Sequence, residues 1–265
     1  MDLNGLLTFI RFPSYRSHGF EWPPNIYQVL ISSDLIVTII FSSITHLNDD
    51  NLLLVIIYAL LYYTSLFFVV YYWFKSSVSN PTDPVVIANR LALIRNMPFD
   101  SSRYENICTI CNTSVGDNSK HCGTCNKCVE GFDHHCIWLN NCIGKINYKL
   151  FIKLIISLLI HEFIIIAASI RLILMHFSSE NIENVSGINT LAVEFFLLIQ
   201  GFVISFFLLN LLLLHIWLYK NEMTTYELIK RRNKKSKRVQ SVDHTEVANS
   251  KVTVSESPKF LNDNN

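Results

Sequence analysis

The chain has 265 residues, half of them hydrophobic, and its 22 basic and 21 acidic side chains nearly cancel to a formal net charge of +1. The mean hydropathy is +0.30, and 18 phenylalanines and 11 tyrosines stand beside only 8 glycines. Four long apolar stretches in so short a chain leave too little polar sequence to cover them. The composition therefore excludes a large soluble domain with buried helices and indicates a membrane protein.

Each apolar stretch is long enough to cross a bilayer as a helix, since about 20 residues span the roughly 30 Å of hydrocarbon. The four expected transmembrane helices occupy residues 26–47, 52–74, 150–175 and 192–217. They separate an N-terminal segment (1–25), a long loop (75–149), a short loop (176–191) and a C-terminal tail (218–265). The N-terminal segment lacks the apolar core and cleavage site of a signal peptide, so we expect the first span to insert uncleaved.

The basic residues predict the orientation of the chain. Two precede the first span, eight lie between Lys75 and Lys149, ten follow the fourth span and two are in the third span, whereas the two short loops have none. Because basic loops stay in the cytosol, we expect both termini and the 75–149 loop to be cytosolic and the 176–191 loop to be lumenal. The sequence carries no other address, so endomembranes, meaning the ER or Golgi, are the expected location.

The long loop contains a block of sulfur and imidazole side chains. All seven cysteines and three of the nine histidines lie between Cys108 and Cys142, spaced C-x2-C-x9-H-C-x2-C-x2-C-x4-D-H-H-C-x5-C. A C-x2-C turn lets two sulfurs reach one zinc ion, and ligands further along the chain complete the tetrahedron. Two such sites take eight of the ten candidates and leave one cysteine and one histidine, the composition of a nucleophile and its base. The count alone does not say which two remain.

The run Asp133-His134-His135-Cys136 suggests where the remaining pair lies. A carboxylate, an imidazole and a thiol can serve as orienting group, base and nucleophile, and the imidazole favours the thiolate. The segment from Cys108 to Phe151 closely resembles the cysteine-rich domain of the DHHC protein S-acyltransferases, the palmitoyltransferases, and includes the Asn147 and Phe151 of that family's pattern. The resemblance implies two interleaved zinc sites. One would be held by Cys108, Cys111, His121 and Cys128, and the other by Cys122, Cys125, His135 and Cys142.

The same resemblance implies the chemistry. Cys136 would take a fatty acyl group from acyl-CoA as a thioester and pass it to a cysteine of a substrate protein, which is ping-pong covalent catalysis. His134 would be the base, Asp133 would orient His134, and both zinc ions would be structural. Palmitoyl-CoA is then the expected co-substrate, and proteins with membrane-proximal cysteines are the expected substrates. The sequence does not indicate whether an accessory subunit takes part.

Two further residues are predicted to contact the acyl chain. Trp138 suits an interfacial aromatic that covers the start of the chain, with a place in the core of the zinc domain as the alternative. His161 lies ten residues beyond Phe151, about 15 Å along a helix, where a sixteen-carbon chain would end. Intramembrane ionisable groups usually face a cavity or each other. The alternative for His161 is a hydrogen bond within the bundle, to Asp34 or Glu162.

The sequence after the fourth span carries three further signals. Thr224-Thr225-Tyr226-Glu227 matches the family's T-T-x-E motif, which packs close to its active site. The stretch 230–238 has seven basic residues in nine and is typical of an anchor to anionic lipid; we weigh nucleic-acid binding as its alternative and predict no nucleic-acid partner. Residues 240–265 are expected to be disordered.

The long loop departs from the family at two places. Val85 replaces the Gly of the family's Asp-Pro-Gly, and the stretch Val115–Ser119 replaces a basic, proline-bearing stretch.

Taken together, these patterns predict an all-α membrane protein with four transmembrane helices and a cytosolic two-zinc cysteine-rich domain, residues 108–149, between the second and third. The predicted function is protein S-palmitoyl transfer. Two alternatives stand beside it: a catalytically inactive DHHC-like scaffold, and a membrane-tethered zinc-binding interaction module. RING and LIM modules share the C-x2-C pairs, but they explain neither the Asp-His-His-Cys run nor the four flanking spans.

Overall fold

The computed structural model describes residues 15–46, 51–178 and 185–237. Within these residues four helices are long and apolar enough to cross a membrane. They are α2 (Ile26–His46), α3 (Leu52–Val78), α5 (Tyr148–Ser178) and α6 (Val185–Lys220). Most of the N-terminal segment and the tail predicted to be disordered, residues 240–265, lie outside the described residues.

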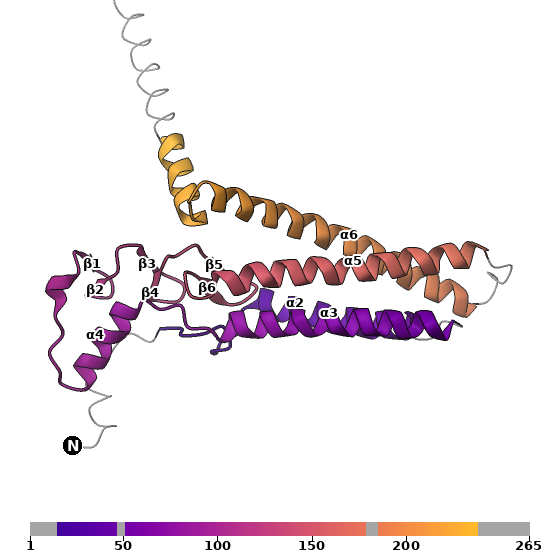
Figure 1. Cartoon of the computed structure of the whole chain (residues 1–265), viewed down its shortest axis with the longest axis horizontal. Coiled ribbons are helices and arrows are strands. Elements are labelled where there is room, and N and C mark those ends of the chain that lie inside the picture. The colour runs from indigo at the N-terminus through magenta and orange to yellow at the C-terminus, as the bar shows by residue number, and fades with distance from the viewer. Residues whose placement is uncertain (1–14, 47–50, 179–184, 238–265) are drawn as a thin grey trace, which may run out of the picture.

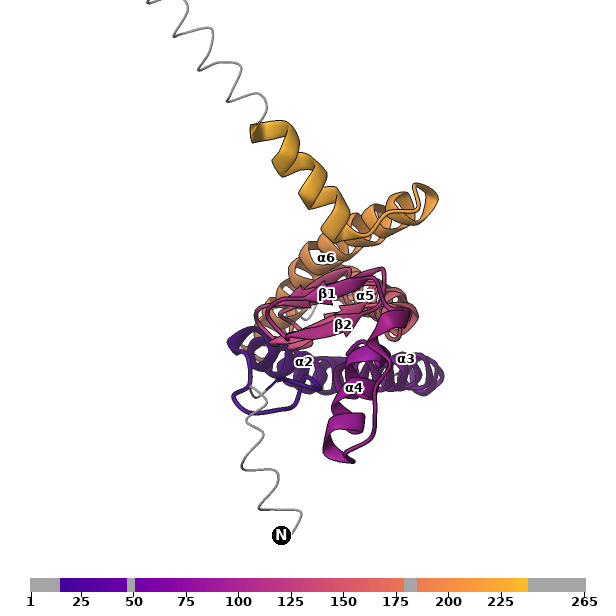
Figure 2. The same cartoon turned by 90° about the vertical axis from the view of Figure 1, so that its left-hand side faces the viewer.

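The four long helices form one bundle, with the cysteine-rich segment at one end. Helix α5 packs against both α3 and α6, and α2 packs against α6 and α5. In Figure 1 the bundle runs along the long axis, and Figure 2 shows the strands in front of the helix ends. The helices extend beyond the predicted spans, since α3 continues to Val78, and α5 and α6 run into the predicted 176–191 loop. A further helical segment, 225–237, follows a turn after α6.

The cysteine-rich segment differs from the all-α prediction, because it consists of three antiparallel β-hairpins. Strand β1 (Asn106–Cys108) pairs with β2 (Thr113–Val115), β3 (Ser119–Cys122) with β4 (Lys127–Glu130), and β5 (His134–Cys136) with β6 (Asn141–Ile143). Each turn contains an asparagine with positive φ: Asn112, Asn126 and Asn140, at 48°, 51° and 50°. Asparagine tolerates this left-handed conformation better than most residues. The turns with Asn112 and Asn126 also contain the second cysteine of a C-x2-C pair, so these paired cysteines lie in hairpins and not in helices.

A short helix that the sequence analysis did not predict, α4 (Pro84–Ile94), covers the first two hairpins. Asp83 caps it: one carboxylate oxygen accepts from the Val85 N–H at 2.7 Å and Pro84 occupies the first turn, a favourable N-terminal arrangement. The other oxygen accepts from the Gly116 N–H at 2.8 Å and from the Ser119 hydroxyl. One carboxylate thus joins the helix start to the hairpins.

The cysteine-rich segment is fixed to the end of α3 by buried polar contacts. The Asn141 amide, fully buried, donates to the carbonyls of Ser76, Ser77 and Ser79 at 3.2, 3.2 and 2.7 Å. The irregular segment before α2 passes between the two parts, where the Gly19 N–H donates to Ser77 O at 2.7 Å. A Cβ on Gly19 would lie 2.0 Å from the Leu139 carbonyl oxygen, so only glycine fits. These contacts position the β5–β6 hairpin against the end of the helix bundle.

Candidate active site and metal centres

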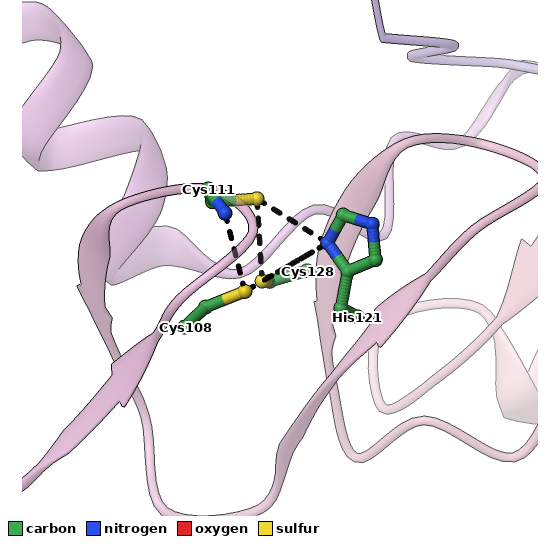
Figure 3. A group of neighbouring side chains, drawn as sticks. All are labelled: Cys108, Cys111, His121 and Cys128. Carbon is green, nitrogen blue, oxygen red and sulfur yellow. Dashed lines mark hydrogen bonds between the residues drawn. The ribbon is translucent and has the colours of Figure 1, made fainter.

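The first Cys/His cluster joins the first two hairpins. Figure 3 shows Cys108, Cys111, His121 and Cys128 converging from β1, the turn after it, β3 and β4. The three sulfurs lie 3.8, 3.3 and 3.9 Å from His121 Nδ1, in the order Cys108, Cys111 and Cys128. One side of the cluster packs against buried apolar side chains, namely Val86 and Val115.

The second cluster repeats this geometry one hairpin further along the chain. Cys122, Cys125 and Cys142 place their sulfurs 3.9, 3.3 and 3.8 Å from His135 Nδ1. In both clusters all four ligand atoms lie within 4.8 Å of one another. Zn–S bonds of about 2.3 Å and Zn–N bonds of about 2.0 Å put tetrahedral neighbours roughly 3.5 to 3.8 Å apart. Three sulfurs and one nitrogen at these separations therefore fit zinc, and the structure brings together the two sets that the resemblance to the DHHC family implied.

Lys127 lies beside the second cluster, with no exposed surface. Its amine donates to the Ser17 carbonyl at 2.9 Å and contacts Asn141 Oδ1 at 3.4 Å. Burial lowers the pKa of Lys127, while the thiolates of Cys125, Cys142 and Cys122 oppose that shift. Because three thiolates around a divalent ion leave one net negative charge, a buried ammonium here supplies the matching positive charge.

Asp133 and His134 form a hydrogen-bonded pair at the start of β5. His134 Nδ1 lies 2.7 Å from Asp133 Oδ2, and the Thr225 N–H donates to the other carboxylate oxygen at 2.9 Å. Burial would raise the pKa of Asp133, but these two hydrogen bonds outweigh it and the pKa is lowered. Burial would likewise lower the pKa of His134, but its contacts with Asp133 and Cys136 raise it to about 9. The imidazole therefore holds a proton at neutral pH.

The Thr224-Thr225-Tyr226-Glu227 motif lies at this pair, as its resemblance implied. Besides the Thr225 contact, the Tyr226 ring packs edge-on against Phe132, with ring centroids 5.8 Å apart. Thr224 and Glu227 exchange hydrogen bonds of 3.2 and 3.0 Å, which is a capping box for the 225–237 helix. The helix cap thus holds a backbone N–H in place for Asp133.

Cys136 is 5% exposed and belongs to a hydrophobic cluster at the start of α5. Its buried neighbours in this cluster are Leu139, Ile143, Phe151, Leu154, Ile155 and Leu159. Side chains of α3 and α6, among them Trp73 and Leu212, pack against the cluster. The thiol therefore lies where the hairpin meets the apolar interior of the bundle.

His215, which was not predicted as a site residue, is brought to the same place by α6. It is 2% exposed, its ring lies 6.1 Å from that of His134, and its Nδ1 is 3.1 Å from the Tyr148 hydroxyl. The Phe151 ring stands edge-on to both imidazoles, at 5.2 Å from His134 and 5.3 Å from His215. A single histidine in an apolar span carries no spacing signal, so only the fold could relate it to Asp133.

The two residues predicted to contact an acyl chain lie in different surroundings. Trp138 is 49% exposed and packs edge-on against Tyr27 at the start of α2, 5.4 Å between centroids. His161 is buried among helices, with Nδ1 2.9 Å from the Ser65 hydroxyl and its ring 4.9 Å from that of Tyr62. Its hydrogen bond within the bundle is therefore to Ser65 of α3, whereas the sequence suggested Asp34 or Glu162 as the partner. A groove of about 470 Å³ between α3 and α5 is lined by residues such as Leu61 and Ile164, and His161 is not among them.

A protein-family model described as DHHC palmitoyltransferase matches residues 101–232. The match begins just before the first hairpin and ends in the helix after α6, so it includes both Cys/His clusters, the Asp133–His134 pair, Cys136 and His215. No curated protein is similar enough to the chain to count as a match.

Proposed function

Because the chain belongs to the DHHC palmitoyltransferase family, we propose that it is an active protein S-acyltransferase that moves a palmitoyl group from acyl-CoA to protein cysteines. The observation that carries this proposal is that the Asp133–His134 pair and Cys136 lie together at the end of the bundle, beside the start of α5. The donor sets of both Cys/His clusters fit zinc, which would hold the three hairpins together and supply no chemistry to the transfer.

At the start of the first step His134 carries the proton of Cys136, and the Cys136 thiolate sulfur attacks the thioester carbonyl of acyl-CoA. A bond forms between this sulfur and the acyl carbon, the bond to the coenzyme A sulfur breaks, and the departing thiolate takes a proton from His134. His134 is suited to this because its contacts with Asp133 and Cys136 raise its pKa to about 9. Asp133, held by the Thr225 N–H, orients the imidazole.

In the second step a substrate cysteine gives its proton to His134 and attacks the Cys136 thioester. The new thioester forms on the substrate, and Cys136 departs as the thiolate. Both steps exchange one thioester for another, so the free-energy change is small and the enzyme contributes a positioned base and an apolar site. The chain of buried side chains from Phe151 to Leu159 supports an acyl chain that enters the bundle from Cys136.

The substrates and the membrane orientation of the site are part of the same proposal. Substrates would be proteins with cysteines near the membrane, because α5 begins only six residues after Cys142. Both termini and the cysteine-rich segment would be cytosolic, and the ER or Golgi would be the location. Trp138, at the end of the bundle beside Tyr27, would cover the first carbons of the acyl chain.

The test is labelling of the purified full-length chain with an alkyne-bearing palmitoyl-CoA analogue. We expect covalent label that hydroxylamine removes, and we expect no label on the Cys136→Ser variant with its zinc content unchanged. Label that persists on Cys136→Ser would reject the assigned nucleophile. Absence of label on the wild-type chain with two zinc ions bound would favour the inactive scaffold.

A further inference from the structure

The Asp133–His134 pair has a third partner that the transfer mechanism does not use. One ligand atom each of Asp133, His134 and His215 lies within 4.8 Å of the others. The three come from different elements: the residue before β5, strand β5 and helix α6. None of them belongs to either Cys/His cluster, so this group is additional to the two predicted zinc sites.

Two imidazoles and a carboxylate form a donor set for divalent transition metals. Zinc sites with three such protein ligands keep a fourth position open, and imidazole suits zinc, copper, nickel and cobalt alike. The Asp133 and His215 side chains are 3% and 2% exposed, whereas 25% of the His134 side chain is exposed. A cation would therefore reach the group from the His134 side and lose most of its contact with water once bound.

The surroundings already hold His215 in a fixed orientation. The Tyr148 hydroxyl lies 3.1 Å from Nδ1, which leaves Nε2 as the nitrogen for a metal. The Phe151 ring packs edge-on against both imidazoles, with ring centroids 5.2 and 5.3 Å away. Such contacts to the second ring nitrogen and to the ring face are what orient metal-ligating histidines.

We propose that Asp133, His134 and His215 bind a third divalent transition-metal ion, physiologically zinc, and that this ion inhibits the transferase reversibly. The binding part stands on the geometry alone, whereas the inhibition part rests on the proposed function. Inhibition follows because a metal on this group replaces the 2.7 Å contact between His134 and Asp133 and occupies the imidazole that must carry the proton.

The third site is expected to be weaker than the other two. It has three protein ligands and no thiolate, whereas each Cys/His cluster has three thiolates and one imidazole. Binding must also break the hydrogen bond between His134 and Asp133. A mild chelator should therefore remove this ion and leave the structural zinc in place, which is the property of a regulatory site.

The direct test is a cobalt titration of the purified full-length chain that already holds two zinc ions. We expect one further Co²⁺ to bind, with visible absorption typical of nitrogen and oxygen ligands and without sulfur-to-metal charge-transfer bands. His215→Leu should abolish this binding. His161→Leu, which removes another buried span histidine, is the matched control and should retain the third cobalt.

A second variant covers the case in which His215→Leu fails to fold. Asp133→Asn removes the carboxylate on the other side of the group and should also lose the third cobalt, while two bound zinc ions report an intact domain. In activity assays, zinc should slow acyl transfer by the wild type roughly 10²-fold, the usual contribution of a base. It should leave the His215→Leu rate, measured relative to its own metal-free rate, unchanged.

Three results would overturn the proposal. They are no third cobalt on the folded wild type, equal cobalt binding by folded His215→Leu, and charge-transfer bands, which would place the metal on Cys136. Third-site binding without a change in rate would overturn the inhibition alone. If the chain transfers no acyl group, the proposed function fails, but the cobalt titration still tests the third metal site. The proposed function and the metal site can therefore be refuted separately.

Discussion

Replacement of Asn141 by alanine should detach the cysteine-rich segment from the bundle. Its amide donates to three carbonyls at the end of α3, the shortest bond being 2.7 Å to Ser79 O, and its oxygen accepts from the Cys142 N–H at 2.9 Å. The residue is fully buried, so water cannot replace these bonds. Counting two amide hydrogens and one accepted bond at about 1 kcal/mol each gives a loss of about 3 kcal/mol.

A loss of that size corresponds to roughly a 10²-fold change in the docking equilibrium, because about 1.4 kcal/mol is a factor of ten. The rate of zinc release to a chelator and the thermal unfolding of the purified chain measure it. We expect faster zinc release and a midpoint lower by about 6 to 12 °C, using the scaling for domains of 150 to 250 residues.

The control for this prediction is Asn106→Ala, in the first hairpin. Asn106 is exposed and its amide makes one bond, to Asp117 at 3.2 Å. Its replacement should change stability by no more than about 0.5 kcal/mol. Equal effects of Asn141→Ala and Asn106→Ala on zinc release would refute the role given to the buried amide.

Three other predictions separate the parts of the site. Cys125→Ala should lose zinc and unfold the hairpins, because structural zinc supplies much of the folding free energy of such modules. Cys136→Ser should keep two zinc ions per chain, and metal analysis of both variants tests this difference. His134→Ala should slow acyl transfer roughly 10² to 10⁴-fold. Part of this loss should be recovered as pH rises, because hydroxide can then deprotonate the Cys136 thiol. A pH–rate profile that His134→Ala leaves unchanged would reject His134 as the base. His161→Ala should shift preference toward longer acyl-CoAs and His161→Trp toward shorter ones, and identical chain-length profiles would remove His161 from the acyl pocket.

Spacing predicted the parts of the fold that depend on local sequence. The apolar stretches predicted the four membrane-length helices, and the spacing of cysteine and histidine predicted two zinc sites. The division of the ligands into the two sets that the structure brings together came from the resemblance to the DHHC family. The hairpins were missed because the metal ligands, and not an alternating apolar pattern, determine those short strands.

The remaining parts of the site depend on contacts between segments far apart in the chain. His215 reaches His134 only because α5 and α6 pack together, and a lone histidine in the apolar run of α6 gives no hint of this. The Thr225 N–H reaches Asp133 across 92 positions of sequence. Helix geometry related His161 to Phe151 along α5, but its partner Ser65 depends on which face of α3 meets α5.

The most direct test of the account is to isolate the acyl-enzyme and follow it. Purified chain would be mixed with palmitoyl-CoA, digested, and examined by mass spectrometry for palmitate on the peptide that contains Cys136; a cysteine peptide would then be added. We predict one palmitoyl group on Cys136 that forms before the peptide is added and disappears at the rate at which acylated peptide appears. Acylated peptide that forms without palmitate on Cys136, or palmitate on Cys136 that the peptide never removes, would contradict the proposed mechanism.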